Sequence, residues 1–541
     1  MTVSVQQAAR QPRLASPSAR GQTANLTPTT IDRLRPVVAG RRFADWPVTV
    51  LVAAIALMLR LVNLGYPNKF IFDETYYAKD AWALLQSGYE REWPKDANAA
   101  ITAGNTDVIG QAASFIVHPP VGKWLIAVGE QLFGMTSFGW RVMPLLFGTL
   151  LVIVTIRLVR RVSQSALIGC TAGLLLALDG LHFVMSRIAL LDIFLAFFTV
   201  ATVACLVADR DWFRARLADH LDRTGLLDLG GRFGPALWWR PWRLAAGVCW
   251  GLALGTKWSA IYLMAAFCLL SVAWDVGARR LAGARHPWQS LARDGLPAFL
   301  AQVPVAAIVY VSSWAGWLAT TGGYDRSWGE QHTDSLAVRL LGKPLGSLLH
   351  YHQEIYRFHT GDYIASQTHT YDAHPIGWLF LGRPTGIDAV NSIQPGTDGC
   401  LGPDNCIRVI SAIGTPALWW GAMACLLVAV VLWVGSADWR FGIPVVGVLA
   451  AWLPWFQYSD RPQFFFYAIV IIPFSVMAVA LCLGKLIGPA NSGDRRMLGA
   501  VLAGAYVALV GANFAYLYPI LTDELLPYPQ WLARMWFRTW I

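Results

Sequence analysis

Long apolar stretches alternate with short polar, arginine-rich stretches from residue 47 to the end of the chain. A helix needs roughly 20 mostly apolar residues to cross a hydrocarbon core about 30 Å thick. The pattern therefore predicts an all-α integral membrane protein with about 11 transmembrane helices, of which the fifth and sixth are short enough to form one hairpin. The predicted spans are 47–64, 138–159, 165–181, 188–208, 243–256, 258–274, 295–318, 414–434, 441–457, 463–484 and 497–519.

Two long polar segments, 65–137 and 319–413, interrupt this alternation. Within the first, residues 75–88 and 119–134 are semi-apolar and compatible with helix. We expect them to form helices that lie in the membrane interface beside the bundle. Ordinary loop helices packed on the outer surface are the alternative. The predicted polytopic catalytic domain thus covers 47–541.

The basic residues predict the orientation of the bundle. Cytoplasmic connections carry an excess of Lys and Arg, and the arginine clusters fall on alternate connections if the amino terminus is inside. Segment 319–413 has six Arg or Lys against nine Asp or Glu, which places it outside. Residues 1–46 carry seven Arg among polar residues and no apolar core, so they are expected to be a disordered cytoplasmic tail. An odd number of spans puts the carboxyl terminus outside.

Composition agrees with a multi-pass protein of the cell membrane. Hydrophobic residues make up 55% of the chain and charged residues only 14%. The net charge of +10 would suggest nucleic acid as the partner of a soluble protein. Here it follows the membrane topology, so membrane lipids and no nucleic acid are expected as partners.

Two of the eight cysteines differ from the rest. Six lie in apolar spans, where a free cysteine is usually a small hydrophobic residue. Cys400 and Cys406 lie in one polar loop on the predicted oxidising side, which favours a disulfide between them over two free thiols.

Asp73 and Glu74 follow the first span within about ten residues, at the predicted outer edge of the membrane. Ionised acids are costly at that depth unless they are paired or functional. A carboxylate there can accept a proton from an attacking hydroxyl as a general base. Capping of a helix that begins near Thr75, or binding of a hard cation, would also explain the pair.

Three cations map to the same outer half: Arg141, Arg187 and Lys257. Basic residues on the outer side oppose the usual topological bias. An anionic group such as a lipid-linked phosphate would explain them, with Arg as a bidentate clamp and Lys as a point charge. Snorkelling, or ion pairs with Asp192 and Asp179, is the alternative.

The segment 350–374 holds five histidines, among them His359, and also Arg357. Their spacing matches no zinc pattern such as H-E-x-x-H, so hydrogen bonding to a sugar or a phosphate is favoured over a metal site. The chain lacks a phosphate-binding glycine loop and a dinucleotide fingerprint. We therefore expect neither a metal nor a cofactor nor a soluble nucleotide donor.

Several segments together resemble the protein O-mannosyltransferase family, and the match runs from about residue 47 to Ile541. Their order and spacing are specific, although no single segment is decisive. The segments are FDETYY at 72–77, HPPVGKW at 118–124, GWRVMPLLFG at 139–148, DGLHFVMSRIALLD at 179–192, GTKWS at 255–259, YHQEIYRFHTGD at 351–362, HTYDAHPIGWL at 369–379 and RMWFRTWI at the end.

The resemblance implies the type C glycosyltransferase fold and transfer of mannose from a polyprenyl-phosphate mannose to Ser or Thr of translocated proteins. Asp73 matches the acid used at the acceptor hydroxyl, and Arg141 the arginine near the donor phosphate. The resemblance also implies that 351–362 folds over Asp73, which would bring Arg357 and His359 to the donor. Segment 319–413 is too short for the β-trefoil domain of eukaryotic members, so the chain resembles the bacterial branch.

From these residues we expect an inverting single displacement on the extracytoplasmic face, with secreted proteins as acceptors and the translocation machinery as a candidate partner. Another transferase of the same fold, which adds a pentose or an aminosugar to a lipid or a glycan, would need the same base and anion clamp. A transporter is a third reading. It is disfavoured because the chain shows no inverted repeat and its polar chemistry gathers at one face.

Overall fold

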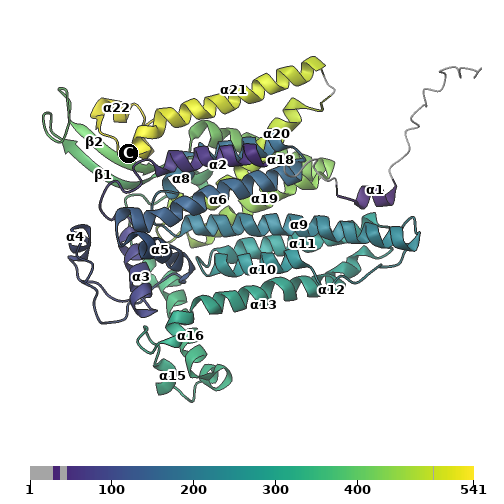
Figure 1. Ribbon diagram of the computed structural model, residues 1–541, viewed down its shortest axis with the longest axis horizontal. Helices are drawn as coiled ribbons and strands as arrows, with labels where there is room; N and C mark the ends of the chain where they lie inside the picture. Colours follow the sequence, from purple (N-terminus) through teal and green to yellow (C-terminus); the bar gives the residue numbers. More distant parts are fainter. Residues whose placement is uncertain (1–28, 37–44, 491–492) are drawn as a thin grey trace, which may run out of the picture.

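The computed structural model describes residues 29–36, 45–490 and 493–541. Long helices run side by side through most of the molecule, and α3 (Glu74–Ser87) and α16 (Leu336–Thr360) run across one end of them (Figure 1). This end carries both long polar segments of the sequence. The structure therefore separates an apolar bundle from a polar layer that caps it.

Each of the eleven predicted spans contains a helix. Seven of these helices, in the described residues, are long and apolar enough to cross a membrane, three are shorter apolar helices, and α10 (Pro241–Leu254) has 14 residues. The separate α11 (Ala260–Leu281) is 22 residues long, so the fifth and sixth spans are distinct helices rather than one short hairpin. The others are α2 (Trp46–Leu61), α6 (Ser137–Ser163), α7 (Ala166–Ala177), α9 (Asp192–Thr224), α13 (Gly295–Ser313), α18 (Pro416–Ser436), α19 (Trp439–Trp452), α20 (Ile472–Ile487) and α21 (Gly493–Leu517).

Short elements connect these helices. They include the first-loop helices α3 and α5 (Val121–Phe133), which occupy the two segments where the sequence predicts helices. The remaining elements are α1 (Thr30–Leu34), α4 (Ala97–Thr102), α8 (Gly180–Met185), α12 (Ser290–Arg293), α14 (Ala315–Ala319), α15 (Trp328–Gln331), α17 (Asp362–Ala365), α22 (Tyr528–Leu532) and the 3-10 turns at Pro287–Gln289, Pro375–Phe380, Leu453–Tyr458, Phe465–Val470, Tyr518–Leu521 and Arg538–Trp540.

Helix α9 lies at the centre of the bundle. The most apolar part of α9 is 78% buried, compared with 22% for α18 at the periphery. Its 33 residues extend beyond the apolar stretch and end at Gly225, whose φ of 65° gives the left-handed cap that glycine adopts without strain. Residues at the first turn of α9 therefore lie at the end capped by α3 and α16, and residues after about 209 lie at the other end.

The expectation of an all-α fold is wrong in one region, because a small antiparallel sheet lies at the capped end. Strand β2 (Cys406–Ala412) pairs with β1 (Thr385–Ile393) on one side and with β3 (Leu526–Pro527) on the other. The strands are short and the third comes from the end of the chain. Such long-range pairing leaves little periodic signal in the sequence.

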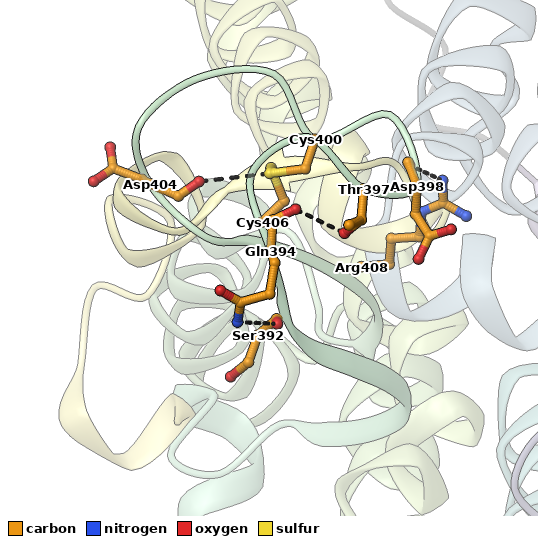
Figure 2. Close-up of a disulfide and its surroundings, with 8 residues drawn as sticks. All are labelled: Ser392, Gln394, Thr397, Asp398, Cys400, Asp404, Cys406 and Arg408. Atoms are coloured by element: carbon orange, nitrogen blue, oxygen red, sulfur yellow. Dashed lines mark hydrogen bonds between the residues drawn. A yellow bond between two sulfur atoms is a disulfide. The ribbon is translucent and has the colours of Figure 1, made fainter.

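A disulfide closes the tip of the β1–β2 hairpin (Figure 2). The sulfur atoms of Cys400 and Cys406 are bonded, with their Cα atoms 5.8 Å apart. Both cysteines are buried with Ile393 and Leu525, while the intervening loop is exposed. The bond fixes the loop to the second strand and holds the outer end of the hairpin.

The predicted disordered tail lies mostly outside the described residues, but part of it is folded. Thr29 accepts a hydrogen bond from the Asp32 amide and Asp32 reciprocates, which caps α1. Leu34 is fully buried against residues of α9 and α11, such as Leu217 and Ala278. Residues 29–36 therefore pack on the end of the bundle that is far from α3.

Candidate active site

Asp73 occupies the N-cap position of α3, at the end of the connection from α2. Its backbone carbonyl accepts hydrogen bonds from the Tyr76 and Tyr77 amides, but its carboxylate caps nothing. The side chain is half-buried, and within the described parts of the chain no hydrogen bond reaches it. The capping explanation for this acid therefore fails, and its carboxylate is available.

Glu74 has the opposite environment. It is fully buried, and its two carboxylate oxygens accept hydrogen bonds from the guanidinium of Arg141 at 2.8 Å and from the amides of Ile71 and Ala189. These four hydrogen bonds fix the position of the carboxylate. Glu74 thus joins the start of α3 to α6 and to the segment before α9, and it does not face open space.

Arg141 is also fully engaged. Besides the bidentate pair with Glu74, its guanidinium donates to the carbonyls of Leu64, Pro67 and Lys69, so all five N–H groups have acceptors. Its exposed fraction is 1%. Arg141 therefore does not face a free anion site. Instead, Arg141 fixes the connection that leads to Asp73.

Arg187 acts on the same connection. Its guanidinium donates to the carbonyls of Arg60, Val62 and Asn63 at the carboxyl end of α2, and it lies over the ring of Phe183. Cations at this end of a helix interact favourably with its dipole. Two of the three predicted outer cations therefore bind backbone carbonyls, and neither lines the cavity that contains Lys257.

A cavity of about 240 Å³ opens between α11, α16 and the segment that follows α19. Aromatic rings form most of its walls, with Lys257 and Arg461 as its two charged residues. The residues that line it are His118, Lys257, Trp258, Ser259, Ile261, Tyr262, Tyr356, His359, Thr360, Pro454, Trp455, Tyr458, Arg461 and Tyr467.

Lys257 stands at the tip between α10 and α11, where it meets the first residue of α9. Its ammonium donates to both carboxylate oxygens of Asp192, at 2.8 and 2.9 Å, and lies 5.2 Å from the centre of the Tyr467 ring. An ammonium has three N–H groups, and Asp192 accepts two. Lys257 therefore keeps a donor for a further acceptor at the cavity wall.

His359, on the last turn of α16, orients Arg461. The Nε2 atom of His359 is 2.8 Å from the Val117 carbonyl, which can only accept, while its Nδ1 is 3.3 Å from an Arg461 N–H, which can only donate. The ring is thus neutral with its hydrogen on Nε2. Both ring nitrogens are occupied, so His359 presents the cation of Arg461 to the cavity.

His118 lines the same cavity as Lys257 and His359. Its ring stacks on His359 with centroids 5.4 Å apart and lies 6.2 Å from the ring of Tyr77. Burial, followed by the nearby charge of Lys257, holds the pKa of His118 well below its usual range. Burial also lowers the pKa of His359 to about 4. Both imidazoles are therefore neutral near pH 7.

The Asp73 carboxyl has a raised pKa. Burial is the main cause, and the charge of Asp192 adds to it while Lys257 opposes it, which leaves the pKa at about 6. A pKa close to the working pH is what a general base needs, because the carboxylate is present and still binds a proton well. Asp73 therefore combines a free carboxylate, a suitable pKa and electrostatic contact with Lys257.

The remaining predicted residue lies elsewhere. Arg357 is exposed on α16, where it pairs with Glu354 at 2.6 Å, and it is not among the residues that line the cavity. Sequence reasoning missed Arg461 and His118. A basic residue between two spans on the outer side, in Asp460-Arg461-Pro462, is a signal that could have identified the first.

Comparison with known proteins places this site in a family. The family model described as Dolichyl-phosphate-mannose-protein mannosyltransferase matches residues 50–286, and a model of the C-terminal four-span region of protein-O-mannosyltransferase matches 344–540. The Polyprenol-phosphate-mannose--protein mannosyltransferase of Mycobacterium tuberculosis H37Rv is 37% identical over 505 residues, which cover 92% of both chains. The chain belongs to the protein O-mannosyltransferase family. The Corynebacterium glutamicum member is 33% identical over 509 residues, 91% of this chain and 92% of its own.

The fold is that of a family member of known structure. This chain is similar in structure to the Saccharomyces cerevisiae protein O-mannosyltransferase Pmt1-Pmt2 complex, solved with its sugar donor. The structural alignment covers 94% of this chain and 94% of the matched chain, with a TM-score of 0.67 and 12% sequence identity. The overall fold of this chain is thus shared with the yeast family member. The residues that line the cavity all fall within the two ranges that the family models match, and Asp73 falls within the first range.

Proposed function

We propose that this chain transfers mannose from a polyprenyl-phosphate mannose to Ser or Thr hydroxyls of translocated proteins, at the outer face of the cell membrane and with inversion at the anomeric carbon. Bacterial relatives that align with 92% of the chain are named for this activity. The distribution of Arg and Lys supports the outer location, because the arginine clusters lie away from Asp73.

The cavity suits the head of the donor. Lys257 keeps one N–H free, and the Nε of Arg461 is buried without an acceptor in the described structure, so both cations can donate to phosphate oxygens. Negative charge grows on the phosphate as it leaves, and fixed donors stabilise it without reorganisation. The rings of Tyr262, Tyr458 and Trp455 offer surfaces on which a sugar can stack.

The rim of the cavity suits the lipid part of the donor. Ile261 and Tyr356 line it and are 48% and 60% exposed. Both belong to helices that would face the hydrocarbon or its interface, so these side chains are exposed to lipid rather than to water. A polyprenyl chain can leave the cavity over them while the phosphate stays beside Lys257.

Asp73 supplies the base. The acceptor hydroxyl oxygen forms a bond to C1 of mannose while the bond from C1 to the phosphate oxygen breaks. The hydroxyl proton passes to the Asp73 carboxylate, and polyprenyl phosphate departs as an anion beside Lys257 and Arg461. Attack from the face opposite the phosphate converts a β-linked donor into an α-mannosyl product. Glu74, Arg141 and Arg187 serve as positioning residues for Asp73, since they bind the connection that carries it.

The observation that carries this proposal is one acid with a free carboxylate next to a cavity that holds two cations. The test is transfer by the purified full chain in lipid vesicles, from polyprenyl-phosphate mannose to a synthetic Ser/Thr peptide. We expect an α-mannosyl peptide, with the anomer assigned by NMR, and no product from GDP-mannose. A β-mannosyl product would contradict inversion, and the absence of any mannosyl peptide would contradict the function.

A further inference from the structure

Strand β1 is an edge strand. In the described chain it pairs with β2 alone, and β2 separates it from β3, so one side of β1 has no strand partner. In Figure 1, β1 lies on the side of the sheet that faces α3 and α4. Unpaired N–H and C=O groups on such an edge can pair with another extended chain.

This edge lacks most of the features that usually prevent an edge strand from pairing with another chain. Residues 385–393 contain no Lys, Arg or Pro, and their single charge, on Asp388, is paired with Lys69 at 2.8 Å. The four residues 389–392 are exposed. Two irregularities in the pairing flank a regular stretch at Asp388–Val390. Bulges of this kind oppose growth of a long intermolecular sheet, but they leave room for a short added strand.

A series of ring contacts links the start of the edge to the neighbour of the candidate base. The Tyr371 hydroxyl lies so close to Gly386 that a side chain there would collide with it. The ring of Tyr371 is 6.0 Å from His369, which is 6.2 Å from Phe72, the neighbour of Asp73. An extended peptide rises about 3.4 Å per residue, so about five residues would reach from β1 to the catalytic carboxylate.

The hairpin is also fixed in place. The disulfide joins its tip to β2, and Cys406 lies opposite Ile393 at the end of β1 (Figure 2). Lys69 belongs to the connection that Arg141 binds through the Lys69 carbonyl, so the Lys69–Asp388 pair links the strand to the catalytic connection. A preorganised edge costs little further ordering when a peptide pairs with it.

We propose that the acceptor polypeptide docks as an added strand on the free edge of β1, which presents its Ser or Thr to Asp73. This inference rests on the proposed function. The occupant is an unfolded, extended segment of the acceptor protein, because only such a segment has its own N–H and C=O groups free. Backbone pairing would hold many sequences in the same way, with little demand on side chains.

The test is a series of acceptor peptides, each with one N-methyl group at a position from the fifth to the tenth residue on either side of the Ser, because about five residues bridge the distance from Asp73 to β1. Alternate amides of an added strand face the edge. On the side of the Ser that pairs with β1, the full chain should therefore show an acceptor KM raised about threefold to tenfold at every second position, with the positions between unchanged. Equal KM values for all peptides, or a uniform rise, would overturn the docking mode.

Two variants of the chain provide a second test. Ala389 and Val390 are neighbours, so the amide of one faces β2 and that of the other faces the free edge. Of Ala389→Pro and Val390→Pro, the variant that keeps the wild-type Tm should raise the acceptor KM and leave the donor KM unchanged. Leu401→Pro, in the exposed loop beyond the strand, is the matched control. Two stable variants with wild-type acceptor KM would contradict the proposal.

Failure of the proposed function gives a different result from failure of the docking mode. If the unmethylated peptide receives no mannose, the chain is not a protein mannosyltransferase. If that peptide is mannosylated and the N-methyl series shows no alternation, the function stands and the β1 edge is not the acceptor site.

Discussion

Two groups of buried charges lie on α9 and differ in how completely they are paired. Far from Asp73, Asp209 of α9 and Asp275 of α11 face Arg240 and Arg243. Each carboxylate accepts hydrogen bonds from both guanidinium groups, at 2.6 to 3.0 Å, and all four side chains are 1% exposed. This group has two positive and two negative charges with no cavity among those described beside it.

The group at the first turn of α9 is incomplete. Asp192 pairs with Lys257, while among the described residues the Asp73 carboxylate has no hydrogen-bond partner and Arg461 has a buried N–H without an acceptor. Seventeen residues separate Asp192 from Asp209, which is about 25 Å along the helix. One helix thus carries a closed ion network at one end and an open one at the other. The first stabilises the bundle, and the second has unused donors and an unused base for a substrate.

The largest effect on activity is expected at the open end. Asp73→Asn keeps the size of the side chain and removes its ability to accept a proton, so transfer should fall roughly 100-fold to 10,000-fold with an unchanged Tm. Single-turnover transfer in vesicles measures this loss. Asp107→Asn, at an exposed position, is the matched control and should keep full activity. Near-normal transfer by Asp73→Asn would exclude Asp73 as the base.

The closed end should respond in the opposite way. Asp209→Asn leaves two buried arginines facing one carboxylate, which should lower the free energy of unfolding by roughly 3–5 kcal/mol. The Tm in detergent measures the effect, with Asp222→Asn as a control because its pair with Arg35 is exposed. The specific activity of the folded variant should match the wild type. A large loss of activity at unchanged Tm would overturn the distinction between the two ends.

Removal of one cation at the open end should weaken donor binding. Arg461→Ala deletes a charged donor to the phosphate, which is typically worth about 1.5–3 kcal/mol, so the donor KM should rise about 10-fold to 150-fold. Titration with the lipid donor at saturating peptide gives this value. Arg357→Ala is the matched control, since Arg357 is exposed and, in the part of the chain that the structure describes, pairs with Glu354 alone. Equal effects of the two substitutions would show that the cavity does not hold the phosphate.

The smallest effect is expected from His359. Both ring nitrogens of His359 are already hydrogen-bonded, and the ring orients Arg461. His359→Ala should therefore raise the donor KM a few-fold, about 1 kcal/mol, and leave kcat unchanged. His359→Gln can keep one hydrogen bond and should recover part of the affinity. A lower Tm with normal kinetics would instead assign His359 a purely structural role.

The helical part of the fold was predictable because burial in lipid requires long apolar stretches, and each stretch is a local signal. The sheet was not predictable. Strand β1 contains Gly386, Asn391 and Ser392, and its small sheet includes β3, which is more than 110 residues away. Pairing at that separation depends on the tertiary structure and leaves little trace in the local pattern.

The candidate site shows the same limit at the level of side chains. The pattern made Asp73 and Lys257 candidates because acids and cations at the outer edge of a span are unusual, whereas His359 became a candidate through the histidine-rich loop and the resemblance of 351–362. It could not distinguish Lys257, which faces the cavity, from Arg141 and Arg187, which bind backbone carbonyls. That distinction depends on where each guanidinium points. Arg461 becomes part of the site only through the fold of α16 over the cavity.

The pH dependence of transfer tests the role of Asp73 most directly. The carboxylate is the active form, so kcat/KM should fall about tenfold per pH unit as pH drops below the Asp73 pKa of about 6. His118 and His359 are already neutral there, so they add no limb between pH 5 and 7. The residual activity of Asp73→Asn should lack this limb. A profile that is flat from pH 5 to 7.5 in the wild type, or a limb near pH 6 that persists in Asp73→Asn, would contradict the account.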